Sequence, residues 1–242
     1  MKLSKESFRI LSDALELAGK YCTDVSIVNN TIRQLSDDRV VILEICFNIP
    51  ETIEKLNVAD VKKKFKIFRL LSNTADESID LDIEERYYTI SDGITTVRFA
   101  HPSDDILTTT FIDDEKIRAK TGIDSAIDLI DFVFDESMLS KINALVDHFN
   151  SRRLIFVPTD NKHCTMRIIS SDKIQKSDIV QLPLVNELSE TLAIAKDPFD
   201  VASDNAKFQL KKTGNSYLCI LKTQLNDSLN LTIYTRAGVT DE

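Results

Sequence analysis

The chain has 242 residues, of which 43% are hydrophobic and 29% are charged. This composition is typical of a globular protein, and the length suits two domains of about 120 residues each. The formal net charge of −9 at pH 7 makes the surface as a whole a poor partner for nucleic acid, because such binding rests on neutralising phosphates.

The sequence also bounds where the protein works. Its apolar runs are too short to cross a bilayer, and the opening residues MKLSKESF lack the apolar core of a secretory signal. We interpret the four scattered cysteines (Cys22, Cys46, Cys164 and Cys219) as reduced thiols of an intracellular protein. The expected location is therefore the cytoplasm, with no membrane contact.

The first half of the chain predicts a helix followed by strands. Ser4 can cap a helix that runs to Ala18, and Gly19 can end it. The pattern of apolar residues and turn residues then predicts strands at 26–28, 31–35, 39–47, 79–84, 87–90 and 95–100, with an extended piece at 49–53 and a hairpin turn at Asp92-Gly93.

A strongly basic helix is predicted within this half, at 57–71 (NVADVKKKFKIFRLL). With 3.6 residues per turn, Lys62, Lys66 and Arg69 fall within an arc of roughly 60°, and Lys63 lies just beyond it. Apolar residues occupy another sector, so the helix can bury one side and present cations on the other. Taken alone, such a charge run is usually an ordinary solvated face.

Residues 101–122 contain a proline and an acidic cluster and show little apolar periodicity, which is typical of a linker. We therefore predict domains at 1–103 and 123–242, joined by a linker at 104–122. The second domain is expected to contain a strand at 127–134, a helix capped by Asp135 and ending near Phe149, strands at 153–157, 166–170, 188–196, 217–223 and 229–236, an extended piece at 199–202 and a short helix at 203–210.

Both halves thus share one predicted order, in which a helix, several strands, a second helix with basic residues and further strands follow one another. Only the layout repeats, because the sequence identity between the halves is negligible. The repetition predicts an α+β protein of two similar domains, each with antiparallel sheets backed by two helices.

Several segments carry a resemblance to a known family. They are the opening KLSK with its helix, the basic helix before a Ser-Asn break, IDLDIEERYYTISDGITTVRFAHPSDD, and DPFDVASDNAKFQLKKTGNSYLCIL. In this order they resemble the ring-shaped DNA sliding clamps, the processivity factors of DNA polymerases, and most closely the two-domain clamps of tailed bacteriophages. Because six domains form each ring in that family, the resemblance implies a homotrimer that encircles duplex DNA.

The resemblance also implies a set of functional surfaces. Helices would line the hole, where cations attract phosphates without reading bases. The implied DNA-facing residues are Lys5, Arg9, Lys62, Lys63, Lys66, Arg69, Lys141, Arg152, Arg153, Lys207, Lys211 and Lys212. Asp13, Glu16 and Asp147 make this surface less uniformly basic.

Partner surfaces follow from the same resemblance. Peptide tails of the DNA polymerase and of the clamp loader would bind in a pocket near the linker, which points to 106–117 and 234–239. Subunits would join edge to edge, with 95–100 and 188–196 as the candidate edge strands.

No catalytic, metal or cofactor site is predicted. The five glycines are isolated and form no phosphate-binding loop, and the three histidines lie far apart in sequence. We therefore expect a non-enzymatic protein without a cofactor. Two alternatives stay open: a scaffold module of two α+β domains whose basic helix is an ordinary solvated face, and an enzyme whose site has no recognised motif.

Overall fold

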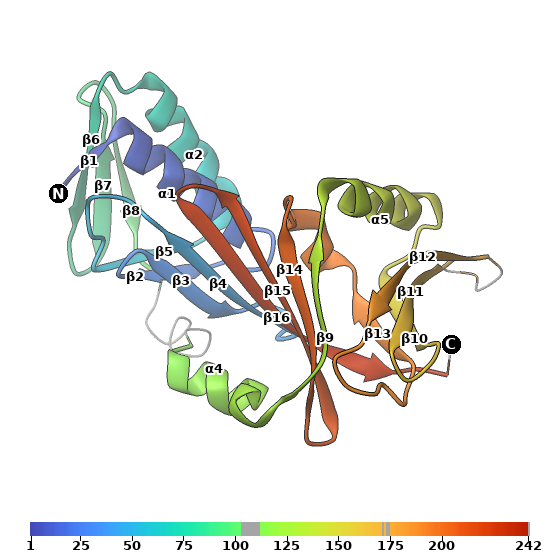
Figure 1. Ribbon diagram of the computed structural model, residues 1–242. Coiled ribbons are helices and arrows are strands. Elements are labelled where there is room, and N and C mark those ends of the chain that lie inside the picture. Colours follow the sequence, from blue (N-terminus) through green and yellow to red (C-terminus); the bar gives the residue numbers. More distant parts are fainter. Residues whose placement is uncertain (103–111, 171, 173–174, 242) are drawn as a thin grey trace. The chain divides into compact units, whose positions relative to one another are not determined.

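The computed structural model describes residues 1–102, 112–170, 172 and 175–241 (Figure 1). The chain divides into two compact units, Met1–Asp113 with Asn226–Asn230, and Asp114–Leu225 with Leu231–Glu242. Each unit combines helices with antiparallel strands, so the predicted α+β class is confirmed. Within the described ranges, no helix is both long and apolar enough to cross a membrane.

Unit 1 contains two long helices and two sets of paired strands. In chain order its elements are β1 (Lys2–Ser4), α1 (Lys5–Ala18), β2 (Val25–Val28), β3 (Thr31–Leu35), β4 (Val41–Phe47), β5 (Lys55–Val58), α2 (Val61–Thr74), β6 (Ser78–Ile83), β7 (Tyr87–Ser91) and β8 (Thr96–Ala100). The strands pair in the orders β1–β6–β7–β8 and β4–β3–β2–β5.

Unit 2 repeats this layout after a short helical segment. In chain order its elements are α4 (Asp114–Thr121), the 3-10 helix η1 (Ile123–Ser125), β9 (Ile127–Phe134), α5 (Glu136–His148), β10 (Arg153–Pro158), β11 (His163–Ile169), β12 (Lys176–Pro183), β13 (Leu192–Ala195), the 3-10 helix η2 (Asp197–Val201), β14 (Ala206–Thr213), β15 (Ser216–Asn226) and β16 (Leu229–Val239). The strands pair in the orders β9–β14–β15–β16 and β12–β11–β10–β13. From β9 onward every element has a counterpart in unit 1, with η2 in the place of α2.

Each unit is built around stacked aromatic rings. In unit 1 the rings of Phe8 on α1 and Phe68 on α2 stack at 5.3 Å, and in unit 2 those of Phe156 on β10 and Phe208 on β14 stack at 5.3 Å. All four side chains are fully buried. Burying a side chain of this size contributes about 1.5–3 kcal/mol, so each pair is a main element of its core.

The basic helix begins and ends later than predicted. Residues 55–58 form strand β5, which pairs with β2 and buries Leu56, Asn57 and Val58. Asp60 then adopts a left-handed backbone conformation (φ 50°). A right-handed helix cannot include such a residue, so α2 cannot extend N-terminally through Asp60. The helix therefore starts at Val61, and it runs past the predicted end to Thr74.

The prediction of a short helix at 203–210 is wrong. Asn205 turns the chain with a φ of 62°, and strand β14 then pairs with both β9 and β15. Residues 206–211 (AKFQLK) alternate apolar and polar side chains, and this period of two matches their alternating burial. Lys207, Lys211 and Lys212 therefore lie on a strand, which corrects the prediction of a fourth basic helix.

Four smaller differences concern the same half of the chain. Helix α4 lies inside the predicted linker, η2 replaces the extended piece at 199–202, β13 is shorter than 188–196, and β12 is a strand that was not predicted. Strand β12 lies at the end of its sheet and carries mostly polar residues on its exposed positions. An edge strand needs less apolar sequence than a central one, which explains why its pattern is weak.

Candidate nucleic-acid interface

Helices α1 and α2 lie side by side and run in opposite directions (Figure 1). Phe8 near the start of α1 stacks on Phe68 near the end of α2, whereas Gly19 after α1 lies against Val61 at the start of α2. A Cβ added at Gly19 would come within 3.4 Å of a Val61 methyl group. The outward side chains of the two helices therefore share one surface, the α1–α2 face, which comprises Arg9, Asp13, Glu16, Lys62, Lys66 and Arg69.

The cations of α2 supply most of the positive charge of this face. The helix carries four lysines and one arginine and has no acidic residue. Lys62 and Lys66 are exposed, and within the described residues they form no ion pair. Lys63 differs, because its ammonium donates to Asp60 at 2.8 Å, a hydrogen bond that raises the pKa of Lys63.

The two arginines of the face are held by carboxylates of α1. Arg69 lies 3.0 Å from Asp13 and 2.5 Å from Glu16. Arg9 donates to both oxygens of Glu6, at 2.9 and 2.6 Å, and lies 3.5 Å from Asp13. The hydrogen bond from Arg9 lowers the pKa of Glu6, so the Glu6 carboxylate remains charged at neutral pH.

Two further lysines of unit 1 have structural contacts. The Lys5 ammonium donates to the carbonyl of Ala75 at 2.7 Å, where it satisfies the last turn of α2. Lys64 lies over the Phe99 ring at 5.1 Å, and burial lowers the pKa of Lys64. Lys5 is exposed and its ammonium is held at the end of α2 by the bond to Ala75, and its contact with DNA stays a prediction.

Lys20 is a cation that the sequence analysis did not select. It follows Gly19, and the neighbouring segment is tied to the start of α2 by a hydrogen bond from the Val61 N–H to the Thr23 carbonyl at 2.8 Å. Lys20 is exposed, and no ion pair links it to any described residue. The close contact of Gly19 with Val61 places Lys20 beside the start of α2, and the periodicity of a single helix cannot predict such a contact.

The predicted cations at and just after α5 in unit 2 are Lys141, Arg152 and Arg153, and all three are exposed. The Lys141 ammonium donates to the carbonyl of Ile179 at 2.8 Å. Ile179 is the extra residue of a bulge in β12, so this contact fixes an edge strand. Arg152 and Arg153 follow α5 as exposed side chains without an ion pair among the described residues.

The predicted lysines of β14 lie in a ladder of charges. Lys207 pairs with Asp131 at 3.0 Å, and Lys211 pairs with Asp128. Burial would raise the pKa of Asp131, but hydrogen bonds from Lys207 and Gln209 outweigh it and lower that pKa. Lys212, on the other side of the strand, lies 5.7 Å from the centre of the Tyr217 ring.

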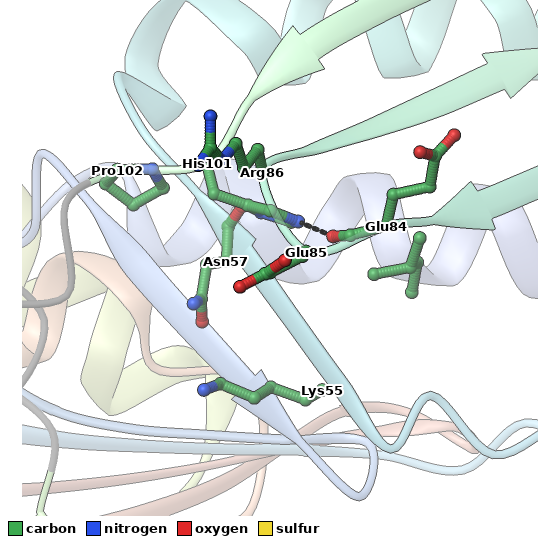
Figure 2. Close-up of a pocket in the computed structure, with 8 residues that line it drawn as sticks. Lys55, Asn57, Glu84, Glu85, Arg86, His101 and Pro102 are labelled. Atoms are coloured by element: carbon green, nitrogen blue, oxygen red, sulfur yellow. Dashed lines mark hydrogen bonds between the residues drawn. The ribbon is translucent and has the colours of Figure 1, made fainter.

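Unit 1 also contains a pocket of about 570 Å³ apart from these cations. It is lined by Lys55, Asn57, Ile83, Glu84, Glu85, Arg86, His101 and Pro102. The His101 ring bridges two strand sets, with Nδ1 3.0 Å from the Asn57 carbonyl oxygen and Nε2 2.9 Å from that of Glu84 (Figure 2). The ring therefore lies between β5 and the β6–β7 turn and donates to these carbonyls through whichever nitrogen carries a proton.

The described histidines, cysteines and acids do not gather into a metal centre. No group of three His, Cys, Asp or Glu side chains in the part of the chain that the structure describes could hold a metal ion. The four cysteines are free, and burial raises the pKa of Cys22 and of Cys164 to about 12. The thiols of Cys22 and Cys164 are thus protonated core side chains.

Comparison with known proteins identifies the fold of the chain. No protein-family model and no curated protein sequence matches the chain. Among solved structures it is similar to PCNA from A. fulgidus, determined with the C-terminal region of FEN-1 bound (TM-score 0.63, 11% identity, 100% of this chain and 99% of that one). It is also similar to PCNA from Entamoeba histolytica (TM-score 0.60, 12% identity, 98% and 97%).

The chain is likewise similar to the beta clamp of Helicobacter pylori, determined with carprofen (TM-score 0.63, 14% identity). The match covers 100% of this chain but 65% of the bacterial one, so the chain spans about two thirds of that clamp. The chain therefore has the sliding-clamp fold, and its length matches the two PCNA chains. The closer resemblance to bacteriophage clamps stays a prediction.

Proposed function

We propose that this protein is a DNA sliding clamp that encircles duplex DNA and tethers the replicative DNA polymerase for processive synthesis. The proposal is supported by helix α2, a helix without acidic residues and with five cations, in a chain that has the clamp fold over its whole length. Contacts to phosphate alone retain a duplex without fixing its register, which permits sliding. This role needs no catalysis, and we propose a non-enzymatic protein that works in the cytoplasm.

The ring would contain three copies of the chain, because six domains are needed and we assign two domains to each chain, at 1–103 and 123–242 with a linker at 104–122. A head-to-tail ring needs two different free edges on each copy. Strands β8 and β12 each lie at the end of a sheet. The candidate edge at 188–196 is corrected, because β13 lies between β10 and β16.

Peptide tails of the polymerase and of the clamp loader are the proposed protein partners. The neighbour from A. fulgidus was determined with the C-terminal region of FEN-1 bound, which supports recognition of partner tails in this fold. For this chain we propose residues 106–117 and 234–239, of which 106–111 lie outside the described residues.

The first test is the solution mass at micromolar concentration, by light scattering coupled to size exclusion. We expect a mass near three times the 27.4 kDa of one chain. A dimer would contradict the ring and would favour the alternative, a scaffold of two α+β domains. A monomer would be followed to higher concentration, where a weak ring must assemble by mass action.

The second test separates encirclement from ordinary binding. The protein is placed on a nicked circular duplex with a cognate loader or at high protein concentration, and the DNA is then cut once. A ring stays on the circle in moderate salt and is lost from the ends of the linear product. Equal retention on both forms would contradict encirclement.

A further inference from the structure

The α1–α2 face contains a continuous network of charges rather than a set of independent cations. Asp13 contacts both arginines, at 3.0 Å from Arg69 and 3.5 Å from Arg9. Glu16 also contacts Arg69, and Glu6 also contacts Arg9. Three carboxylates thus oppose two guanidinium groups. The network therefore brings no net positive charge to this part of the face.

The carboxylates lie where a phosphate approaching the arginines would meet them. The Arg9 and Arg69 side chains are 52% and 49% exposed, and those of Asp13 and Glu16 are 24% and 37% exposed. An arginine already neutralised by a carboxylate releases fewer condensed counterions when it meets DNA. The adjacent carboxylates also repel a phosphate within a Debye length of about 8 Å at physiological salt.

The lysines of the same face are in the opposite situation. Lys62 and Lys66 on α2, with Lys20 beside the start of that helix, are exposed and have no carboxylate partner among the described residues. Their ammonium groups can exchange water for phosphate oxygen without breaking an ion pair. Charge on the face is therefore divided between open lysines and restrained arginines.

We propose that Asp13 and Glu16 restrain Arg69, that Glu6 and Asp13 restrain Arg9, and that these contacts weaken the hold of the α1–α2 face on duplex DNA. Lys20, Lys62 and Lys66 then make the phosphate contacts. This inference rests on the proposed clamp function and adds a determinant of affinity to it. The carboxylates keep the contact weak enough for the duplex to move past the face.

The experiment measures how binding of the intact protein to a nicked circular duplex depends on salt, and how fast the protein diffuses along that duplex. Asp13→Asn combined with Glu16→Gln should steepen the slope of log K against log salt by about 0.9 for each additional phosphate neutralised. The diffusion coefficient of the protein along the duplex should fall by the same factor by which binding tightens. A matched control, Asp80→Asn with Asp82→Asn, removes two exposed acids of β6 and should leave both quantities close to wild type.

A double-mutant cycle identifies the arginines as the cause. In an Arg9→Gln, Arg69→Gln background, removal of Asp13 and Glu16 should give no gain. The same gain in that background, or in the Asp80 and Asp82 control, would show a general charge effect and overturn the restraint. An unchanged slope with a lower melting temperature would also overturn it, since the acids would then act only in packing α1 against α2.

The wild-type protein is measured first, because its binding to duplex DNA tests the clamp function itself. If the wild-type protein shows no salt-dependent binding to duplex DNA, both proposals fail. If it binds and the variants do not differ, only the restraint fails.

Discussion

Helix α2 in unit 1 and the 3-10 helix η2 in unit 2 hold the same place in the order of elements, but they differ in length and charge. Helix α2 has 14 residues with five cations and no acid, whereas η2 has five residues, DPFDV, with two acids and no cation. The strands around them pair alike, since β1 pairs with β6 and β9 pairs with β14. The fold therefore does not require a long helix at this place.

What both elements supply is one buried aromatic ring. Phe68 of α2 stacks on Phe8, and Phe199 of η2 packs against Phe134 and Phe208. Phe68 is fully buried and Phe199 is 1% exposed. Helix α2 buries Val61, Phe68 and Leu71 on one side, so its exposed lysines on the other side are free to serve another purpose, which we propose is contact with DNA.

The largest effect is expected from removing the cations of α2. Replacing Lys62, Lys63, Lys66 and Arg69 by alanine should leave the trimer intact and shorten retention on circular DNA by about tenfold or more, because each lost phosphate contact flattens the salt slope by about 0.9. The matched variant in unit 2 replaces Arg152, Arg153 and Lys212. Equal losses of retention in the two variants would contradict the proposal that α2 contributes more to DNA contact than the cations of unit 2.

A smaller effect should separate structural lysines from open ones. Lys211 is 14% exposed and pairs with Asp128, so Lys211→Met should destabilise the chain by about 1 kcal/mol in urea unfolding. The control Lys207→Met removes a pair whose members are 46% and 37% exposed, and should change stability by less than about 0.5 kcal/mol. A loss of DNA retention by Lys211→Met at unchanged stability would support the prediction that Lys211 faces DNA.

A hydrogen-bonded carboxylate at the start of α1 should stabilise the fold at neutral pH and lose this effect in acid. Burial would raise the pKa of Glu51, but its hydrogen bonds from the Ser7 hydroxyl and the Ser4 N–H lower it below the ordinary value of 4.5. A lowered pKa in the folded state stabilises the fold above pH 4.5, and the contribution disappears as pH falls through the folded value. Glu51→Gln should therefore cost about 0.5–1 kcal/mol at pH 7 and nothing near pH 2.5. A cost that persists in acid would assign the effect to packing.

The smallest effect should have the opposite sign, at η2. Burial raises the pKa of Asp200, and Lys196 offsets this only in part. A raised pKa means that the charged carboxylate costs stability at neutral pH and that the cost disappears as pH falls through the folded value. Asp200→Asn should therefore stabilise the chain by a few tenths of a kcal/mol at pH 7, since the side chain is 45% exposed. Destabilisation at pH 7 would show that the Lys196 contact dominates.

The sequence by itself determined the features that depend on neighbouring residues. Ser4 and Asp135 cap α1 and α5 as predicted, since each accepts the N–H of the residue three positions later, at Ser7 and Met138. The strand at 127–134 was predicted with the correct bounds, and the repeated order of elements was recognised. Caps and periodicity are local, and so they can be read along one segment.

The tertiary structure decided what depends on distant residues. Both capped helices gain a carboxylate from a distant residue, because the Ser4 N–H donates to Glu51 and the Glu136 N–H donates to Asp204. Residues 206–213 form a strand because β9 and β15 lie on either side of it, although lysines made it look like the end of a basic helix.

The candidate interface shows the same limit. Periodicity placed Lys62, Lys66 and Arg69 on one side of α2, but only the antiparallel contact with α1 brings Asp13 and Glu16 to Arg69. Whether a cation is open or paired depends on charges that lie more than 50 residues away in sequence, as they do for Arg69 and Asp13. Charge pairing acts through space, and for that reason the fold and not the sequence pattern decided which cations remain for DNA.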